Sequence, residues 1–144
     1  MKRVLLPIDG SDRSRRTIRM LKALYRPEDV KVILATVVMR EERIESAYIR
    51  KRWKDASREI FDAALEQLTE YDTETVLLEG NPGAEIVRYA EEEQVDQIML
   101  TRSSRGPLRK LGSVASYIVR RAPSQDLIIM HEMREDRPEE DPAS

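Results

Sequence analysis

Apolar residues gather along this chain in five short runs, which are separated by longer segments of mixed polarity. Each run is nearly continuous in apolar or β-branched residues, the pattern of a strand buried on both faces of a parallel sheet. The predicted strands are residues 2–8, 30–39, 73–78, 95–100 and 126–131.

Between the runs, apolar residues recur at intervals of three and four, which is the spacing of one face of a helix. The first helix follows Ser11 or Asp12, either of which can cap it, and the third follows Asn81 with Pro82 at its first position. The predicted helices are residues 12–25, 42–71, 82–93 and 112–121.

The longest predicted helix carries an apolar stripe that steps by three and four along one face. We interpret its tryptophan as a packing residue rather than as a platform for a nucleotide base. The stripe consists of Trp53, Ala56, Ile60, Ala64 and Leu68.

Strands and helices therefore alternate strictly, from a first strand to a fifth. This order predicts right-handed crossovers and an open, doubly wound α/β fold, with one five-stranded parallel sheet and helices on both faces. We expect one domain over residues 1–132. Residues 133–144 are charged, contain proline and have almost no apolar content, so we expect an acidic, disordered tail.

Composition removes several classes of chemistry. The chain has 144 residues with no cysteine and one histidine, which excludes a disulfide scaffold, a thiolate metal site and a multi-histidine metal centre. The P-loop pattern and the G-x-S-x-G elbow are both absent. We therefore predict no catalytic residues, no metal site and no enzymatic activity beyond, at most, slow ATP hydrolysis.

The same observations bear on location and partners. The apolar runs are too short to span a bilayer, and the first residues enter a strand pattern without the apolar region of a signal peptide. The formal net charge is −2. We predict a cytoplasmic protein that binds neither membrane nor nucleic acid.

Charge is nevertheless unevenly distributed. Residues 102–125 contain no acid but six basic residues, and they include Gly112-Ser113, which opens a helix. In a parallel sheet, ligands bind beyond the carboxyl ends of the strands, and helix N-termini favour anions. Two interpretations stay open here, a phosphate site and a solvated basic loop. The basic residues are Arg102, Arg105, Arg109, Lys110, Arg120 and Arg121.

Several segments also resemble the universal stress protein family, in order and over residues 2–131. The resemblance implies a Rossmann-like fold of the adenine-nucleotide alpha-hydrolase type and a dimeric protein of the stress response. The segments that carry it are VLLPIDGS at 4–11, GNPGAEIV at 80–87, DQIML at 96–100, GSVASYIVRRAP at 112–123 and DLII at 126–129.

One branch of that family binds ATP through a G-x2-G-x9-G-[ST] pattern after the fourth strand, and this chain departs from it. Gly112-Ser113 matches the end of the pattern, whereas its first two glycines fall on Thr101 and Ser104, or, in a second alignment, on Ser103 and Gly106. A side chain at such a position blocks close approach of the backbone and disfavours positive φ. Arginines of the loop offer partial compensation, because guanidinium groups bind phosphate well.

The resemblance and the topology together name one set of candidate nucleotide-binding residues. Asp9 is either a hydrogen-bond acceptor for the adenosine end or a turn former with Gly10, and Val37 lines the adenine pocket or is plain core. The bound molecule implied is ATP or another adenine nucleotide. The candidates are Pro7, Ile8, Asp9, Val37, Thr101, Ser104, Arg105, Gly106, Gly112, Ser113 and Val114.

Two functional hypotheses follow. The leading one is a dimeric regulatory or binding module whose nucleotide site is degenerate, and the alternative is a protein that binds ATP or another adenine nucleotide through the remnant loop. We expect a homodimer through the apolar last strand, Leu127–Met130, because an open apolar edge is usually paired or covered. A protein partner at the basic loop is a third possibility.

Overall fold

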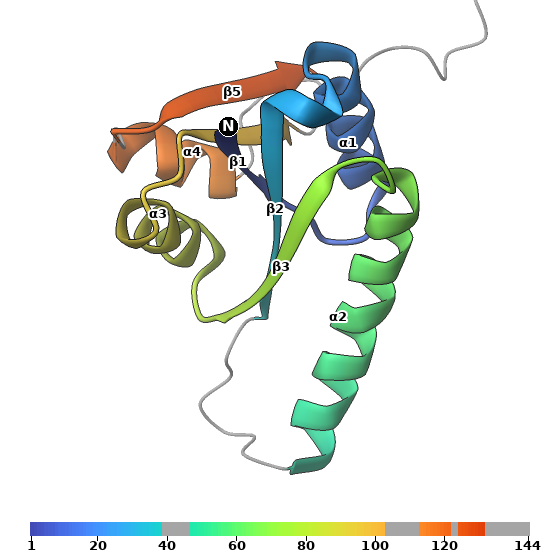
Figure 1. Cartoon of the computed structure of the whole chain (residues 1–144). Coiled ribbons are helices and arrows are strands. Elements are labelled where there is room, and N and C mark those ends of the chain that lie inside the picture. Colours follow the sequence, from blue (N-terminus) through green and yellow to red (C-terminus); the bar gives the residue numbers. More distant parts are fainter. Residues whose placement is uncertain (39–46, 103–112, 122–123, 132–144) are drawn as a thin grey trace, which may run out of the picture.

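Neighbouring strands of the sheet all run parallel, in the order β3-β2-β1-β4-β5. The computed structural model describes residues 1–38, 47–102, 113–121 and 124–131 (Figure 1). It confirms the predicted five-stranded parallel sheet and its α/β class. The strands are β1 (Lys2–Pro7), β2 (Val30–Val38), β3 (Asp72–Glu79), β4 (Gln97–Arg102) and β5 (Asp126–His131).

The helices lie on both faces of the sheet, as a doubly wound fold requires (Figure 1). A short 3-10 turn, Pro27–Asp29, precedes β2. The predicted tail, residues 133–144, lies outside the described residues. The four helices are α1 (Asp12–Leu24), α2 (Ala47–Gln67), α3 (Pro82–Glu92) and α4 (Ser113–Arg121).

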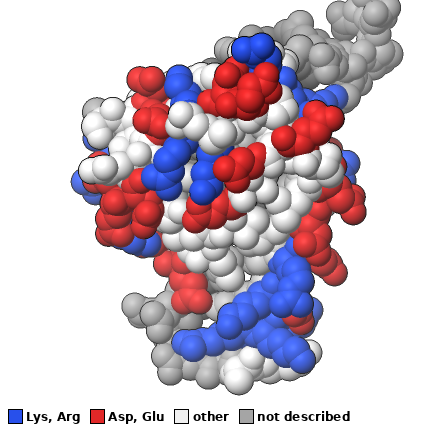
Figure 2. All heavy atoms as spheres, in the orientation of Figure 1, with Lys and Arg blue, Asp and Glu red and all other residues white. Residues whose placement is uncertain are grey.

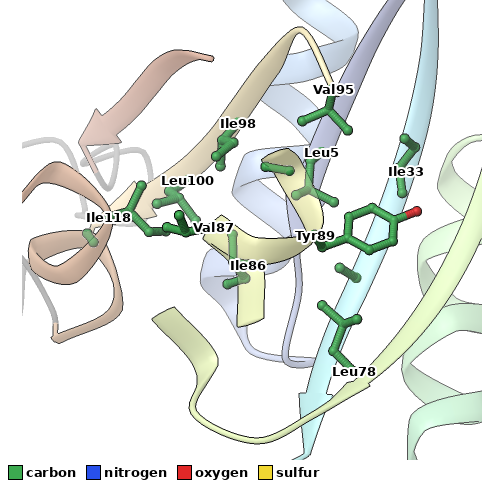
Figure 3. Packing of buried hydrophobic residues seen from close by; sticks show 13 residues of the cluster. Leu5, Ile33, Leu78, Ile86, Val87, Tyr89, Val95, Ile98, Leu100 and Ile118 are labelled. Carbon is green, nitrogen blue, oxygen red and sulfur yellow. The ribbon is translucent and has the colours of Figure 1, made fainter. Parts of the chain in front are cut away.

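Two apolar cores form because successive side chains of a strand point to opposite faces. Val4 and Leu6 of β1 pack with α1 and α2 on one face. Leu5 of the same strand packs on the other face with α3 and α4, through residues such as Ile86 and Ile118 (Figure 3). Val4, Leu5 and Leu6 are all fully buried, so β1 is the central strand of the molecule.

Helix α2 departs from its expected pattern. Ala64 and Leu68 are buried as predicted, but Ala56 is exposed and its neighbour Ser57 is buried, while Trp53 is only partly buried. Figure 1 shows the N-terminal half of α2 reaching past the ends of the strands. That half contacts little of the sheet, so its apolar spacing does not define a buried face.

The part of α2 that reaches past the sheet is strongly positive. Figure 2 shows basic side chains gathered at the lower end of the molecule, where this part of the helix lies. Its exposed cations are Arg50, Lys51, Arg52 and Lys54. No helix in the described part of the chain is both long and apolar enough to cross a membrane.

Candidate functional site

A cavity of about 290 Å³ opens beside the carboxyl ends of β1, β2 and β4. The strand order reverses between β1 and β4, and ligands of open α/β sheets bind at such a reversal. The first turns of α1, α3 and α4 also border the cavity. Its lining consists of Pro7, Ile8, Asp9, Arg13, Ser14, Thr17, Ala35, Val37, Pro82, Ile86, Leu100, Thr101, Ser113, Val114 and Ala115.

The turn from β1 to α1 holds Asp9 in a fixed position. Asp9 Oδ1 accepts hydrogen bonds from the Ser11 N–H at 2.9 Å and from the Ser14 hydroxyl at 3.0 Å. The Asp9 N–H in turn donates to Ser14 Oγ at 2.9 Å. Gly10 has φ +80°, a left-handed conformation that glycine adopts without strain. The turn-forming role of Asp9 is therefore real, and it leaves the second carboxylate oxygen without a hydrogen bond among the described residues.

The Asp9 carboxylate is also held in its charged form. Partial burial raises the pKa of Asp9, but hydrogen bonds from Ser11 and Ser14 and the positive charge of Arg13 outweigh this effect. The pKa of Asp9 consequently lies below its ordinary value of 3.8. Near neutral pH, the cavity therefore presents an anionic acceptor in a fixed position.

A hydroxyl pair joins α1 to β4 beside the cavity. The Thr17 and Thr101 hydroxyl oxygens are 2.6 Å apart, and the Thr17 hydroxyl donates to the Arg13 carbonyl at 2.9 Å. A hydroxyl has one proton to donate, so Thr101 must be the donor to Thr17. Toward a ligand, the Thr101 hydroxyl can then act only as a hydrogen-bond acceptor.

The remaining walls are mostly apolar. Both backbone polar groups of Ile8 are hydrogen-bonded within the protein. Its N–H donates to the Ala35 carbonyl at 2.8 Å, and its carbonyl accepts from the Thr36 hydroxyl at 2.9 Å. Ile8 therefore offers the cavity an apolar side chain, as Val37 and Leu100 also do. An apolar enclosure with a few fixed polar groups is typical of small-molecule sites.

The structure brings a large part of the candidate set to this one cavity. Ser104, Arg105, Gly106 and Gly112 lie outside the described residues, as does the rest of the basic loop up to residue 112. The candidates that line the cavity are Pro7, Ile8, Asp9, Val37, Thr101, Ser113 and Val114.

Sequence reasoning missed the contribution of two helices. Arg13, Ser14 and Thr17 reach the cavity from α1, and Pro82 and Ile86 reach it from α3. A signal for α1 was present, because positions 13 and 17 lie on one face of the predicted helix, which begins just after Asp9. For α3, the only signal was the predicted cap, which gives the start of the helix but not its neighbours.

Metal ligation has no support within the described part of the chain. There, no group of three or more histidine, cysteine, aspartate or glutamate side chains comes close enough together to hold an ion. Asp9 is the one carboxylate among the described residues that line the cavity.

A doubly wound parallel sheet with a cavity at its strand-order reversal defines the class of the protein, an open α/β fold of the Rossmann-like type. Within this class, the chain belongs to the universal stress protein family, whose family model matches residues 1–130. The family named on sequence motifs is thereby confirmed. A comparison with curated protein sequences finds no significant match.

Solved structures agree with this assignment. The hypothetical protein MJ0577 is 21% identical, with a TM-score of 0.79 over 92% of this chain and 97% of its own. The hypothetical protein PH0823 is 29% identical, with a TM-score of 0.76 over 94% and 99% of the two chains. A universal stress protein solved in complex with cAMP is 26% identical, with a TM-score of 0.62 over 90% and 96%.

Proposed function

We propose that this protein is a regulatory binding module that holds an adenine nucleotide in the cavity between β1 and β4. One observation carries the proposal: Asp9 stands at a mostly apolar cavity, and Ser11 and Ser14 fix one of its carboxylate oxygens, while the other accepts no hydrogen bond from the described residues. A ribose hydroxyl is a donor that suits the second oxygen, and an apolar wall suits an adenine ring.

The family supplies further support. One similar universal stress protein is solved in complex with cAMP, another from Archaeoglobus fulgidus with dAMP, and one from Arabidopsis thaliana with AMP. All three ligands contain adenine and one phosphate group. This favours the nucleotide-binding alternative over a module whose cavity stays without a ligand.

Binding without rapid turnover is the form we propose. Hydrolysis of a phosphate ester needs a base or a metal ion to activate water. Among the described residues at the cavity, Asp9 is the one carboxylate, and its lowered pKa makes it a weak base. The described residues of the site thus include groups suited to hold a nucleotide but no group well suited to activate water.

Calorimetric titration with AMP, ADP, ATP and cAMP tests the proposal directly. We expect saturable binding that GMP does not reproduce, and at least a tenfold loss in Asp9→Asn, which keeps the shape but removes the charge. Asp12→Asn is the matched control, since Asp12 is an exposed neighbour that pairs with Arg15 and does not line the cavity. Absence of binding heat at millimolar concentrations of all four nucleotides would contradict the proposal.

We further propose that the protein forms a homodimer through β5. Among the described strands, β5 is at the edge of the sheet and pairs with β4 alone, and its Leu127, Ile128 and Ile129 remain partly exposed. Pairing with a second copy would cover this edge. Sedimentation at micromolar concentration should give a dimer, and Ile128→Lys should give a monomer. A monomeric wild-type protein would refute the proposed homodimer.

The cytoplasmic location stays a prediction.

A further inference from the structure

Arg13 is the one positive side chain among the described residues that line the cavity. It lies in the first turn of α1, four residues after Asp9 in the sequence, and Asp9 is the one negative side chain among the described residues of the same lining. The lining therefore carries one charge of each sign, and both belong to the segment that follows β1.

These two charges do not form a tight pair. The closest approach of Arg13 Nη2 to Asp9 Oδ2 is 3.7 Å, which is longer than a hydrogen bond. The side chains are 42% and 61% exposed, so solvent screens their attraction. A guanidinium group has five N–H donors, and this contact leaves them available for a ligand.

The charge of Arg13 changes what the cavity can accept. Without it, the described lining would carry only the carboxylate of Asp9, which would repel a phosphate group. With it, the two charges cancel, and a planar donor group that suits phosphate oxygens stands beside the site. The first residues of α4, Ser113 and Val114, line the same cavity, and the N-terminus of a helix favours an anion.

In the G-x2-G-x9-G-[ST] pattern, the glycines let the backbone approach the phosphates closely. This chain has other residues at some of these glycine positions. Thr101 occupies one of them, and its hydroxyl proton is engaged by Thr17. Arg13 places a cation at the same cavity from a different element of the fold, helix α1.

We propose that Arg13 is the specificity-determining residue of this cavity, and that it makes the site select a phosphorylated nucleoside over the free nucleoside. This inference rests on the proposed function. It adds the residue that reads the phosphate group.

Titrations with AMP and with adenosine test the inference. We expect the wild-type protein to bind AMP at least about tenfold more tightly than adenosine, because charge-assisted hydrogen bonds have that order of effect. Arg13→Gln should remove this preference while leaving the affinity for adenosine unchanged. Arg13→Lys, which keeps the charge but not the planar fork, should give an intermediate preference.

Arg15→Gln is the matched control. Arg15 is on the same helix, pairs with Asp12 at 3.8 Å and does not line the cavity, so its loss should leave the ratio of the two affinities unchanged. Adenosine binding also reports that each variant is folded. The wild-type preference should decrease as salt is added, as for any contact with an exposed cation.

Different failures have different meanings. Equal affinity of the wild-type protein for AMP and adenosine overturns the role of Arg13 and leaves nucleotide binding intact. A parallel loss of both affinities in Arg13→Gln also overturns it, since the residue would then be structural. If the wild-type protein binds neither molecule, the proposed function itself fails.

Discussion

Gly83 of α3 lies so close to Tyr117 of α4 that a Cβ atom at residue 83 would stand 2.8 Å from the Tyr117 Cβ and Cγ atoms. The Tyr117 side chain therefore packs directly against the Gly83 backbone, where no side chain of residue 83 intervenes. This contact belongs to the face of the sheet that carries the starts of α3 and α4, which both border the cavity.

Gly83→Ala should destabilise the protein by about 1 to 3 kcal/mol, because an overpacked core must shift its helices or its rotamers. Urea unfolding monitored by circular dichroism measures this effect. In a Tyr117→Gly background the same substitution should cost much less, since the Tyr117 Cβ, Cγ and Cδ1 atoms that the new Cβ would meet have been removed. Equal costs in both backgrounds would contradict the packing argument.

Gly10→Ala should weaken both the fold and nucleotide binding. A left-handed φ of +80° costs an alanine about 1 to 2 kcal/mol, and its Cβ would lie 3.1 Å from Ile60 Cγ1. Relief of this strain would move Asp9 away from Ser11 and Ser14. Unfolding and AMP titration should therefore both report a loss, and unchanged values in both would show that the turn does not constrain Asp9.

Stability should depend on pH through Asp9. The folded-state pKa of this carboxyl is lowered, so its contribution to stability is present above the unfolded-state pKa and is lost as the pH falls through the folded-state value. The free energy of unfolding of the wild type relative to Asp9→Asn should be constant near neutral pH and should decrease below about pH 4. Denaturant unfolding of both proteins at pH 7, 5, 4 and 3 measures this difference in unfolding free energy. If the advantage of the wild type increased on acidification, the prediction would be contradicted.

Tyr25→Phe should cost about 1 to 3 kcal/mol of stability, because it leaves the buried Gln97 side-chain oxygen without its donor. In the structure the Tyr25 hydroxyl donates to Gln97 Oε1 at 2.8 Å, and Gln97 is 4% exposed. Tyr48→Phe is the control, since Tyr48 is 68% exposed. Gln97 begins β4, so it lies at the amino-terminal ends of the strands, whereas the cavity is beside their carboxyl ends. AMP affinity should therefore not change. A loss of AMP affinity in Tyr25→Phe would contradict this separation.

The centre of the sheet was predictable because β1, β2 and β4 are largely buried on both faces and carry nearly continuous apolar runs. The start of α3 was predictable for a local reason, since the Asn81 side chain accepts a hydrogen bond from the Ala84 N–H at 3.2 Å and Pro82 follows it. Both signals lie within a few residues of each other in the chain.

The apolar stripe of α2 and the contribution of α1 to the site were not predictable in the same way. Ala56 was assigned to a buried face by its spacing, but burial depends on where the sheet ends, which no local pattern records. Arg13 and Thr17 reach the cavity because α1 packs beside β4, a strand about 80 residues later in the sequence. Contacts between distant segments define a site, whereas periodicity defines only elements.

The central position of β1 has a consequence for biosynthesis. β1 is made first, yet one of its two neighbours is β4, with Val4 opposite Gln97 and Leu5 opposite Ile98. A nascent chain that ends before Gln97 therefore leaves one side of its central strand, with the apolar residues Val4, Leu5 and Leu6, without a partner. Such unpaired edges promote aggregation, and pairing of distant segments is slow. The last third of the chain thus protects the first strand, and truncated translation products should be the species that aggregate.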